Sequence, residues 1–211
     1  MGFEATTPPA IQGRRERKRQ RMASHIATTA FELFEALGYD AVTMEQIAAE
    51  ADVAKATLYS YFPMKEALVA HRFKDEIVAG MDGLEQRLAA EPSFASRMDL
   101  LLRESAAWHV ARRGYLAYYL RYLNSPVASG DAGPDADTAS SVTWRILASM
   151  FRAAQQHGEI SNAVPAERLG WYLEFLLYGA ITRWLAQPDI DLADEFRLVF
   201  GLLMTGVEQG K

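Results

Sequence analysis

The fold is decided by residues 43–65, which read TMEQIAAEADVAKATLYSYFPMK. Thr43 can cap a short helix, because Gln46 three positions later completes a capping box. An apolar stripe with helical spacing then follows through Met44, Ile47, Ala48 and Ala51. The pattern predicts a short helix that buries one face.

A second short helix is predicted after a bend at Asp52 and Val53. The side chain of Val53 is expected to be buried and to fill the inside of this turn, which contains no glycine. Its expected inward positions are Ala54, Leu58 and Phe62. Its expected outward positions are Lys55, Thr57, Tyr59 and Ser60. Pro63 ends this helix because it lacks a backbone donor. A short helix with one polar face, braced by another helix, is typical of a helix-turn-helix that enters a DNA major groove.

Around this motif, over roughly residues 20–70, the sequence resembles the tetracycline-repressor (TetR) family of bacterial regulators. The matching residues are Phe31, Phe34, Gly38-Tyr39, Thr43, Ile47-Ala48, Ala51, Val53, Lys55, Thr57-Leu58-Tyr59, Tyr61-Phe62 and Lys65-Glu66-Ala67-Leu68. At three positions the chain departs from the family pattern: Ala54 replaces a frequent Ser, Ala56 a frequent Gly, and Met64 a capping Ser or Asn. We expect these departures to change which operator is recognised and to leave the fold intact.

The resemblance implies that Lys55, Ala56 and Tyr59 face the base edges of DNA. Ser60 is expected to assist them, with Ala56 against a thymine methyl group. Phosphate contacts, which supply affinity without sequence information, are expected from Thr43, Thr57, Tyr61 and Lys65.

Six basic residues occupy eight positions before the motif and are offset only by Glu16. They are Arg14, Arg15, Arg17, Lys18, Arg19 and Arg21. Although the net charge of the whole chain is −5, a local cluster of this kind is typical of a phosphate-binding surface. The alternative is a solvated basic tail without a partner, and the helix-turn-helix that follows favours DNA.

The composition excludes several classes of protein. A length of 211 residues fits one domain or two small ones. The absence of cysteine excludes disulfides, thiolate metal sites and a cysteine nucleophile. The first residues do not form a signal peptide, and no run approaches the roughly 18 apolar residues of a membrane span. We therefore expect a cytoplasmic protein with no membrane partner.

Enzyme and metal-binding functions are not supported by any motif in the sequence. We find no zinc-protease, nucleophile-elbow or phosphate-loop motif, and no glycine-rich dinucleotide motif. The four histidines are scattered through the chain, which indicates no metal site. We therefore predict a protein that is not an enzyme and needs no cofactor.

The sequence shows helical periodicity and no alternating strand pattern, so we predict an all-α protein of about nine helices. Outside the motif, the predicted helices cover residues 17–37, 64–90, 94–113, 115–123, 138–157, 166–186 and 192–207. Gly114 is the predicted break within the central helices, and residues 125–137 are the predicted internal loop. Residues 1–13 are predicted to be a disordered extension, 14–66 a DNA-binding domain, and 67–211 a ligand-sensing and dimerisation domain.

The last two predicted helices are apolar on more than one face, so each must be buried on several sides. We predict that they form a homodimer interface, as a four-helix bundle across a two-fold axis. The expected interface residues are Leu173, Leu177, Ile181, Trp184, Phe196, Val199, Phe200 and Leu203. The alternative is an interior helix pair in a monomer.

Aromatic residues are frequent in the second half of the chain and suit a large, apolar ligand. The candidate pocket residues are Trp108, His109, Tyr115, Tyr119, Tyr122, Trp144, Phe151, Trp171, Glu174, Phe175 and Tyr178. The alternative is that many of them are ordinary core residues, with His109 a satisfied core histidine.

By resemblance, we expect a ligand-responsive transcriptional repressor that binds a near-palindromic DNA operator as a homodimer. A small, largely apolar or aromatic effector would release it from DNA by rotating the helix that follows the motif. The alternative is an architectural or interaction protein with the same DNA-binding part, controlled by a protein partner. The identity of the effector, the operator sequence and the target genes do not follow from the sequence.

Overall fold

The computed structural model describes residues 13–125, 127, 139–187 and 189–208. The predicted N-terminal extension before residue 13 and most of the predicted loop 125–137 lie outside these residues. Contacts divide the chain into two compact units, Met1–Arg72 and Phe73–Lys211, which we call unit 1 and unit 2. The described residues form helices and connecting turns and contain no strand, so the predicted all-α fold class is confirmed.

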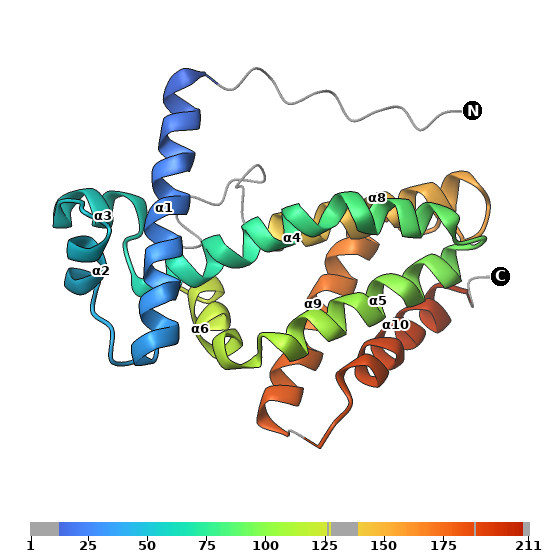
Figure 1. Ribbon diagram of the computed structural model, residues 1–211. Helices are drawn as coiled ribbons and strands as arrows, with labels where there is room; N and C mark the ends of the chain where they lie inside the picture. Colours follow the sequence, from blue (N-terminus) through green and yellow to red (C-terminus); the bar gives the residue numbers. More distant parts are fainter. Residues whose placement is uncertain (1–12, 126, 128–138, 188, 209–211) are drawn as a thin grey trace. The chain divides into compact units, whose positions relative to one another are not determined.

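Unit 1 is built around the predicted motif (Figure 1). Its helices are α1 (Arg14–Leu37), α2 (Met44–Glu50), α3 (Lys55–Tyr61) and the first part of α4 (Lys65–Ala90). Helix α2 packs against both α1 and α3. The buried side chains that join these helices include Ile26, Phe34, Ile47, Leu58 and Phe62.

Both ends of α1 follow from local chemistry. The helix begins at Arg14, three residues earlier than predicted, so the basic block lies on its first turns. It ends at Gly38, whose φ of 84° is accessible to a residue without a Cβ atom. The Gly38 amide donates to the carbonyl oxygen of Phe34 at 2.9 Å, which satisfies one of the last carbonyl groups of the helix.

Unit 2 contains the remainder of α4 and the later helices. They are α5 (Phe94–Ala111), α6 (Arg113–Leu123), α8 (Ala139–Gln156), α9 (Ala166–Ala186) and α10 (Leu192–Glu208). Helix α9 packs against α8 and α10, and α5 and α10 lie side by side (Figure 1). The predicted bounds of α9 are confirmed at both ends.

The break between α5 and α6 differs from the prediction. Arg112, with φ of −114° and ψ of 16°, closes α5 and precedes α6, and Gly114 is already the second residue of α6. The amide of Arg112 donates to the carbonyl oxygen of His109 at 3.1 Å, which tightens the last turn of α5. The backbone of a non-glycine residue therefore makes the bend that the sequence attributed to Gly114.

Helices α8 and α9 approach each other closely at Gly170. A Cβ atom at this position would lie 2.8 Å from the backbone nitrogen of Ala148 and 3.0 Å from its Cα. The side chains of Leu147, Phe151 and Leu169 around this crossing are fully buried. The missing side chain of Gly170 thus lets the two helices share a tightly packed core.

Candidate functional site

The turn between α2 and α3 is made without a glycine. Asp52 has a φ of 51°, a left-handed conformation that Asp tolerates better than most residues. The amide of Val53 donates to the carbonyl oxygen of Ala48 at 3.0 Å, which closes the turn. Val53 itself is half-buried, so it fills the turn less completely than predicted.

Ala54 is exposed, which corrects the prediction that it faces inward. It precedes α3 with φ of −62° and ψ of 142°, an extended conformation that takes it off the helical row of Leu58 and Phe62. Leu58 is 0% exposed and is the single buried residue of α3, so it alone anchors the helix in the core of unit 1. The inward face of α3 is therefore shorter than the periodicity indicated.

The opposite face of α3 is open to solvent. Lys55, Ala56, Tyr59 and Ser60 are exposed, Tyr59 by 39%, and Thr57 is half-buried. The hydroxyl group of Ser60 donates to the carbonyl oxygen of Thr57 at 2.7 Å, so its remaining capacity is that of an acceptor. The structure thus brings the predicted base-facing side chains together on one uncovered surface, and their role in DNA binding stays a prediction.

Lys55 forms an ion pair with Glu45 of α2. The hydrogen bond between the two groups lowers the pKa of Glu45 and raises the pKa of Lys55 from their ordinary values. The Lys55 ammonium also lies 5.9 Å from the centre of the Tyr59 ring. Sequence reasoning missed Glu45, because nothing in the spacing of the two helices indicates that this carboxylate reaches the exposed face of α3.

Lys65 has a structural role that the sequence did not indicate. Its ammonium donates to the carbonyl oxygens of Tyr39 at 2.7 Å and Val42 at 2.8 Å, and lies 4.2 Å from the centre of the Tyr39 ring. These bonds connect the start of α4 to the segment before α2. Two of the three ammonium donors are thus used within unit 1, and the predicted phosphate contact of Lys65 stays a prediction.

Thr43 forms the predicted capping box at the start of α2. Its hydroxyl oxygen accepts from the amide of Gln46 at 3.2 Å, and its own amide donates to the Gln46 side chain at 2.8 Å. The box fixes the first turn of α2, on which the position of α3 depends. A phosphate contact of Thr43 is untested.

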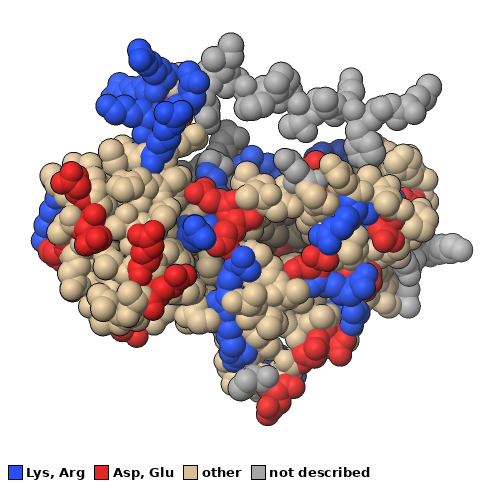
Figure 2. Space-filling view, viewed as in Figure 1, with Lys and Arg blue, Asp and Glu red and all other residues tan. Residues whose placement is uncertain are grey.

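The basic block forms a positive surface on the first turns of α1 (Figure 2). All six of its side chains are exposed: Arg14, Arg15, Arg17, Lys18, Arg19 and Arg21. The guanidinium of Arg19 lies 5.8 Å from the ring centre of Tyr61, the last residue of α3. This contact places the block and the end of α3 in the same region of unit 1.

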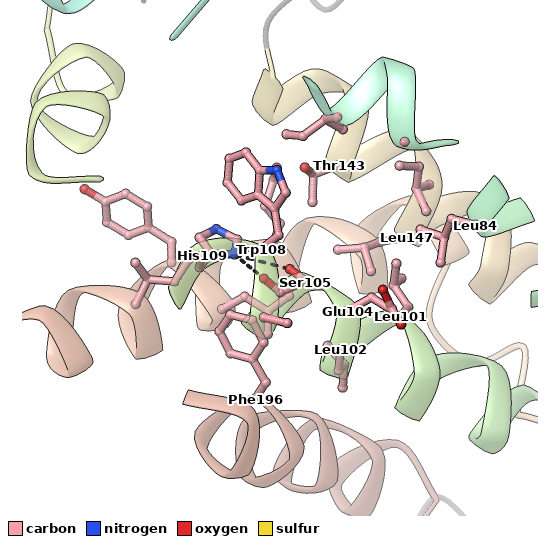
Figure 3. A pocket seen from close by; sticks show the side chains of 18 of the residues that line it. Leu84, Leu101, Leu102, Glu104, Ser105, Trp108, His109, Thr143, Leu147 and Phe196 are labelled. Carbon is pink, nitrogen blue, oxygen red and sulfur yellow. Dashed lines mark hydrogen bonds between the residues drawn. The ribbon is translucent and has the colours of Figure 1, made fainter. Parts of the chain in front are cut away.

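Unit 2 contains a partly open cavity of about 460 Å³. Helices α4, α5, α6, α8, α9 and α10 all contribute to its lining, which is dominated by aliphatic side chains (Figure 3). The aliphatic lining residues include Ile77, Met81, Leu84, Leu101, Leu102, Leu116, Leu120, Leu123, Ile146 and Leu147. Its size lies within the range of pockets that hold drug-sized molecules, roughly 300–1,000 Å³.

Five of the predicted pocket residues line this cavity: Trp108, His109, Tyr119, Glu174 and Tyr178. Six others do not, and these are Tyr115, Tyr122, Trp144, Phe151, Trp171 and Phe175. Phe151 is 0% exposed and packs against Phe94, whereas Trp171 and Phe175 point to solvent from α9. Sequence reasoning also missed the aliphatic lining, because leucines of a pocket and leucines of a core have the same periodicity.

His109 is a half-buried, neutral side chain at the cavity. Its Nδ1 lies 2.7 Å from the carbonyl oxygen of Ser105, which can only accept, so Nδ1 carries the proton. Burial lowers the pKa of His109 to about 4, and the neighbouring charge of Arg112 acts in the same direction. His109 therefore adds a polar but uncharged group to the lining at neutral pH.

Two ion pairs border the cavity. Arg87 of α4 pairs with Glu104 of α5 at 2.9 Å, and Arg112 pairs with Glu76 of α4. Three of these residues, Glu76, Arg87 and Glu104, line the cavity. Burial raises the pKa of Tyr119, and the charge of Glu174 acts in the same direction, so the hydroxyl group of Tyr119 is neutral.

The face of α9 and α10 that is open to solvent is strongly apolar. Its exposed side chains are Trp171, Tyr172, Phe175, Leu176, Leu198 and Leu202. The predicted interface residues Leu173, Leu177, Ile181, Trp184 and Phe196 are instead buried within the chain, so their assignment to a subunit interface is wrong. Val199, Phe200 and Leu203 are half-buried. The choice of α9 and α10 as interface helices stays a prediction.

Two further kinds of site are not found among the described residues. No group of three or more His, Asp or Glu side chains in this part of the chain is arranged to hold a metal ion. Within the same residues, every helix is too short or too polar to cross a lipid bilayer.

Comparisons with known proteins agree with this architecture. The family model described as bacterial regulatory proteins, tetR family, matches residues 26–71. The MftR protein of Mycobacterium tuberculosis, named as a mycofactocin biosynthesis transcriptional regulator, is 21% identical over 198 residues, which are 92% of this chain and 94% of that protein.

Two solved structures share the fold. FadR of Thermus thermophilus, a TetR-family repressor in complex with lauroyl-CoA, matches with a TM-score of 0.77 and 24% identity, over 87% of this chain and 94% of that chain. FadR of Bacillus subtilis, in complex with stearoyl-CoA, matches with a TM-score of 0.62 and 19% identity, over 87% and 98%. Residues 26–71, which contain the helix-turn-helix of unit 1, therefore match the tetR family of bacterial regulatory proteins, and the chain shares its fold with these TetR-family structures.

Proposed function

We propose that this protein is a homodimeric repressor that binds a near-palindromic DNA operator through α3 and is released by a small apolar ligand bound in unit 2. The observation that carries the proposal is the uncovered face of α3, where Lys55, Ala56, Tyr59 and Ser60 are exposed together. A helix of this length, braced by α2, suits the major groove.

Affinity for DNA would come from the basic block. Six cations on the first turns of α1 can neutralise several phosphates, and each neutralised phosphate releases counterions from the duplex. The contact of Arg19 with Tyr61 supports a joint surface of the basic block and α3. Lys55 must exchange its ion pair with Glu45 for a contact with DNA, so the base contact competes with a contact inside the free protein.

The cavity of unit 2 supports a largely apolar effector. The solved structures of similar fold hold lauroyl-CoA and stearoyl-CoA, and an acyl chain suits the aliphatic lining found here. Helix α4 contributes Lys65 to unit 1 and Ile77, Met81 and Leu84 to the cavity. A ligand with different affinities for two arrangements of α4 would shift the population that can bind DNA.

The exposed apolar face of α9 and α10 supports the homodimer. Six large apolar side chains are exposed on these two helices. Single exposed apolar residues are normal on a protein surface, but a group of them indicates an interaction surface. Pairing this face with its copy through a two-fold axis would bury both surfaces as a four-helix bundle. The axis would place two α3 helices roughly 34 Å apart, one turn of DNA, which requires a near-palindromic operator.

The proposal is tested by selecting duplexes from a random DNA pool with the purified protein and sequencing them. We expect an inverted repeat whose half-sites are about one helical turn apart. Adding decanoyl-CoA should then weaken binding to the selected duplex in a fluorescence anisotropy assay. Selection of no common sequence would contradict the DNA-binding function, and a selected duplex that no apolar ligand releases would contradict the regulation.

A further inference from the structure

One position in the wall of the cavity in unit 2 has no side chain. Gly80 lines the cavity from α4, and residues three and four positions before it and four positions after it lie on the same face of the helix. The residues that α4 contributes to the cavity are Glu76, Ile77, Gly80, Met81, Leu84 and Arg87. Near the middle of this face, the cavity therefore reaches the backbone of α4.

The fold does not require a glycine at this position. Gly80 lies inside α4 without a positive φ, where a glycine makes a helix less stable than an alanine does. Among the described residues, a Cβ atom built at Gly80 would meet no atom within 4 Å beyond the neighbouring backbone of its own helix. At Gly170, by contrast, such an atom would lie 2.8 Å from the backbone nitrogen of Ala148. Neither backbone conformation nor helix packing therefore explains Gly80.

The space at Gly80 is part of the cavity. Gly80 is exposed, whereas Ile77 and Met81, which line the cavity beside it, are half-buried. Carbon atoms in contact are about 3.5–4.0 Å apart, so even a methyl group at Gly80 would leave room before the next atom. The cavity is therefore wider at Gly80 than at the neighbouring positions of α4, where side chains occupy its wall.

Helix α4 is attached to α5 on both sides of Gly80. Glu76 pairs with Arg112 at the end of α5, and Arg87 pairs with Glu104 of α5 at 2.9 Å. Glu76 and Arg87 line the cavity from α4, one before Gly80 and one after it. These two attachments oppose an inward bend of α4, so the space of the missing side chain stays open for a ligand.

We infer that Gly80 determines the width of the ligand that the cavity admits. Its missing side chain leaves room for a ring or a branched apolar group directly against the backbone of α4. A larger residue at this position would fill that room and exclude wide ligands before it excluded slim, flexible ones. The inference rests on the proposed function for the existence of an apolar ligand, and it names the residue that selects among such ligands by their width.

The test uses two alcohols that have the same number of carbon atoms and differ in width. In 1-adamantanol the carbon atoms form a compact cage, and in 1-decanol they form a flexible, unbranched chain. The affinity of each alcohol for the full-length protein without DNA is measured by isothermal titration calorimetry, with the protein in the syringe. The same measurement is made on variants of Gly80 and of Gly83, a second exposed glycine of α4 that does not line the cavity.

Gly80→Leu should weaken the binding of 1-adamantanol by about tenfold or more, because the new side chain overfills the space that the cage needs. The binding of 1-decanol should weaken by less than about threefold, since a flexible chain can follow another path through the cavity. Gly83→Leu is the matched control. A Cβ atom at Gly83 also meets no atom within 4 Å among the described residues, and both affinities should stay within about twofold of the wild-type values.

Two further measurements separate this effect from a loss of folding. Gly80→Ala should raise the melting temperature, because alanine favours the helix, and yet bind 1-adamantanol about twofold to fivefold more weakly. In the wild-type protein, the nuclear Overhauser effect should connect the protons of bound 1-adamantanol with the Hα protons of Gly80 and not with those of Gly83.

Three results would overturn the inference: an equal loss of 1-adamantanol affinity in Gly80→Leu and Gly83→Leu, an equal loss for the two alcohols in Gly80→Leu, or no Overhauser effect at Gly80. A wild-type protein that binds neither alcohol would contradict the apolar ligand of the proposed function and the inference with it. All of these measurements are made without DNA, so a failure to select an operator would contradict the proposed function alone.

Discussion

The ammonium of Lys55 has two competing negative partners, the carboxylate of Glu45 and the phosphates and base edges of DNA. Both side chains of the ion pair are more than half exposed, so the pair contributes little to stability. Its main effect is on binding, because Glu45 adds a negative charge to the surface that must approach DNA.

Glu45→Gln should therefore strengthen binding to duplex DNA. We expect a rise of about twofold to fivefold in affinity for any sequence, since the loss of an exposed charge pair frees Lys55 and removes a repulsion. Fluorescence anisotropy at constant salt measures it. Glu35→Gln, an exposed glutamate of α1, is the matched control. Weaker binding by Glu45→Gln would show that Glu45 positions Lys55 for DNA.

His109 should make the stability of the protein depend on pH below neutrality. The pKa of its imidazole is about 4 in the folded chain and has its ordinary value of 6.5 in the unfolded chain. As the pH falls, the unfolded chain therefore binds a proton at His109 before the folded chain does. The contribution of His109 to the free energy of unfolding is fully present above pH 6.5. It decreases as the pH falls towards 4, by about 3 kcal/mol in all. Urea unfolding at pH 7.5 and pH 5 should show a smaller loss in His109→Gln than in the wild-type protein. The exposed His157→Gln is the control, and equal losses in the wild type and His109→Gln would contradict the burial of His109.

Whole elements were predicted better than the directions of individual side chains. The capping box at Thr43 and both ends of α9 follow from local sequence, because capping and helix breaking act within a few residues. Ala54 was misplaced because an extended residue before a helix does not share the periodicity of that helix. The ion pair of Glu45 with Lys55 joins two elements, and no local pattern predicts such a contact.

The crossing of α8 and α9 depends on one missing side chain. Gly170→Ala should destabilise the protein by about 1–3 kcal/mol, because its Cβ would meet the backbone of Ala148, which cannot move aside without shifting α8. Gly83→Ala is the matched change at an open helical position and should stabilise by up to about 1 kcal/mol. Thermal unfolding followed by circular dichroism measures both variants. Similar shifts of the melting temperature in the two variants would contradict the close approach.

At the scale of the whole molecule, the sequence could not separate the core of unit 2 from its exposed apolar face. Leu173 and Leu177 are buried within the chain, and Phe175 between them is 66% exposed. A helix that is apolar on all sides contains no pattern that tells its own core from a partner's surface. The same limit applies to the cavity, where the frequency of aromatic residues favoured an aromatic pocket and the structure shows a largely aliphatic lining.

Phe175→Glu and Leu202→Glu should each convert the proposed dimer to a monomer. These side chains are 66% and 65% exposed, so the new carboxylates would stay solvated in the monomer and be buried in the proposed four-helix interface. Sedimentation velocity measures the change, and Val110→Glu on α5 is the matched control. A wild-type protein that sediments as a monomer at micromolar concentration would contradict the homodimer itself.

The central claim is that the uncovered face of α3 recognises DNA, and titration of the selected operator with Lys55→Ala and Tyr59→Ala tests it most directly. Each loss of a base contact should weaken binding by about tenfold to a hundredfold, with an unchanged melting temperature because both side chains are exposed. Glu35→Ala should bind like the wild-type protein. Wild-type affinity of both Lys55→Ala and Tyr59→Ala for the operator would contradict the claim.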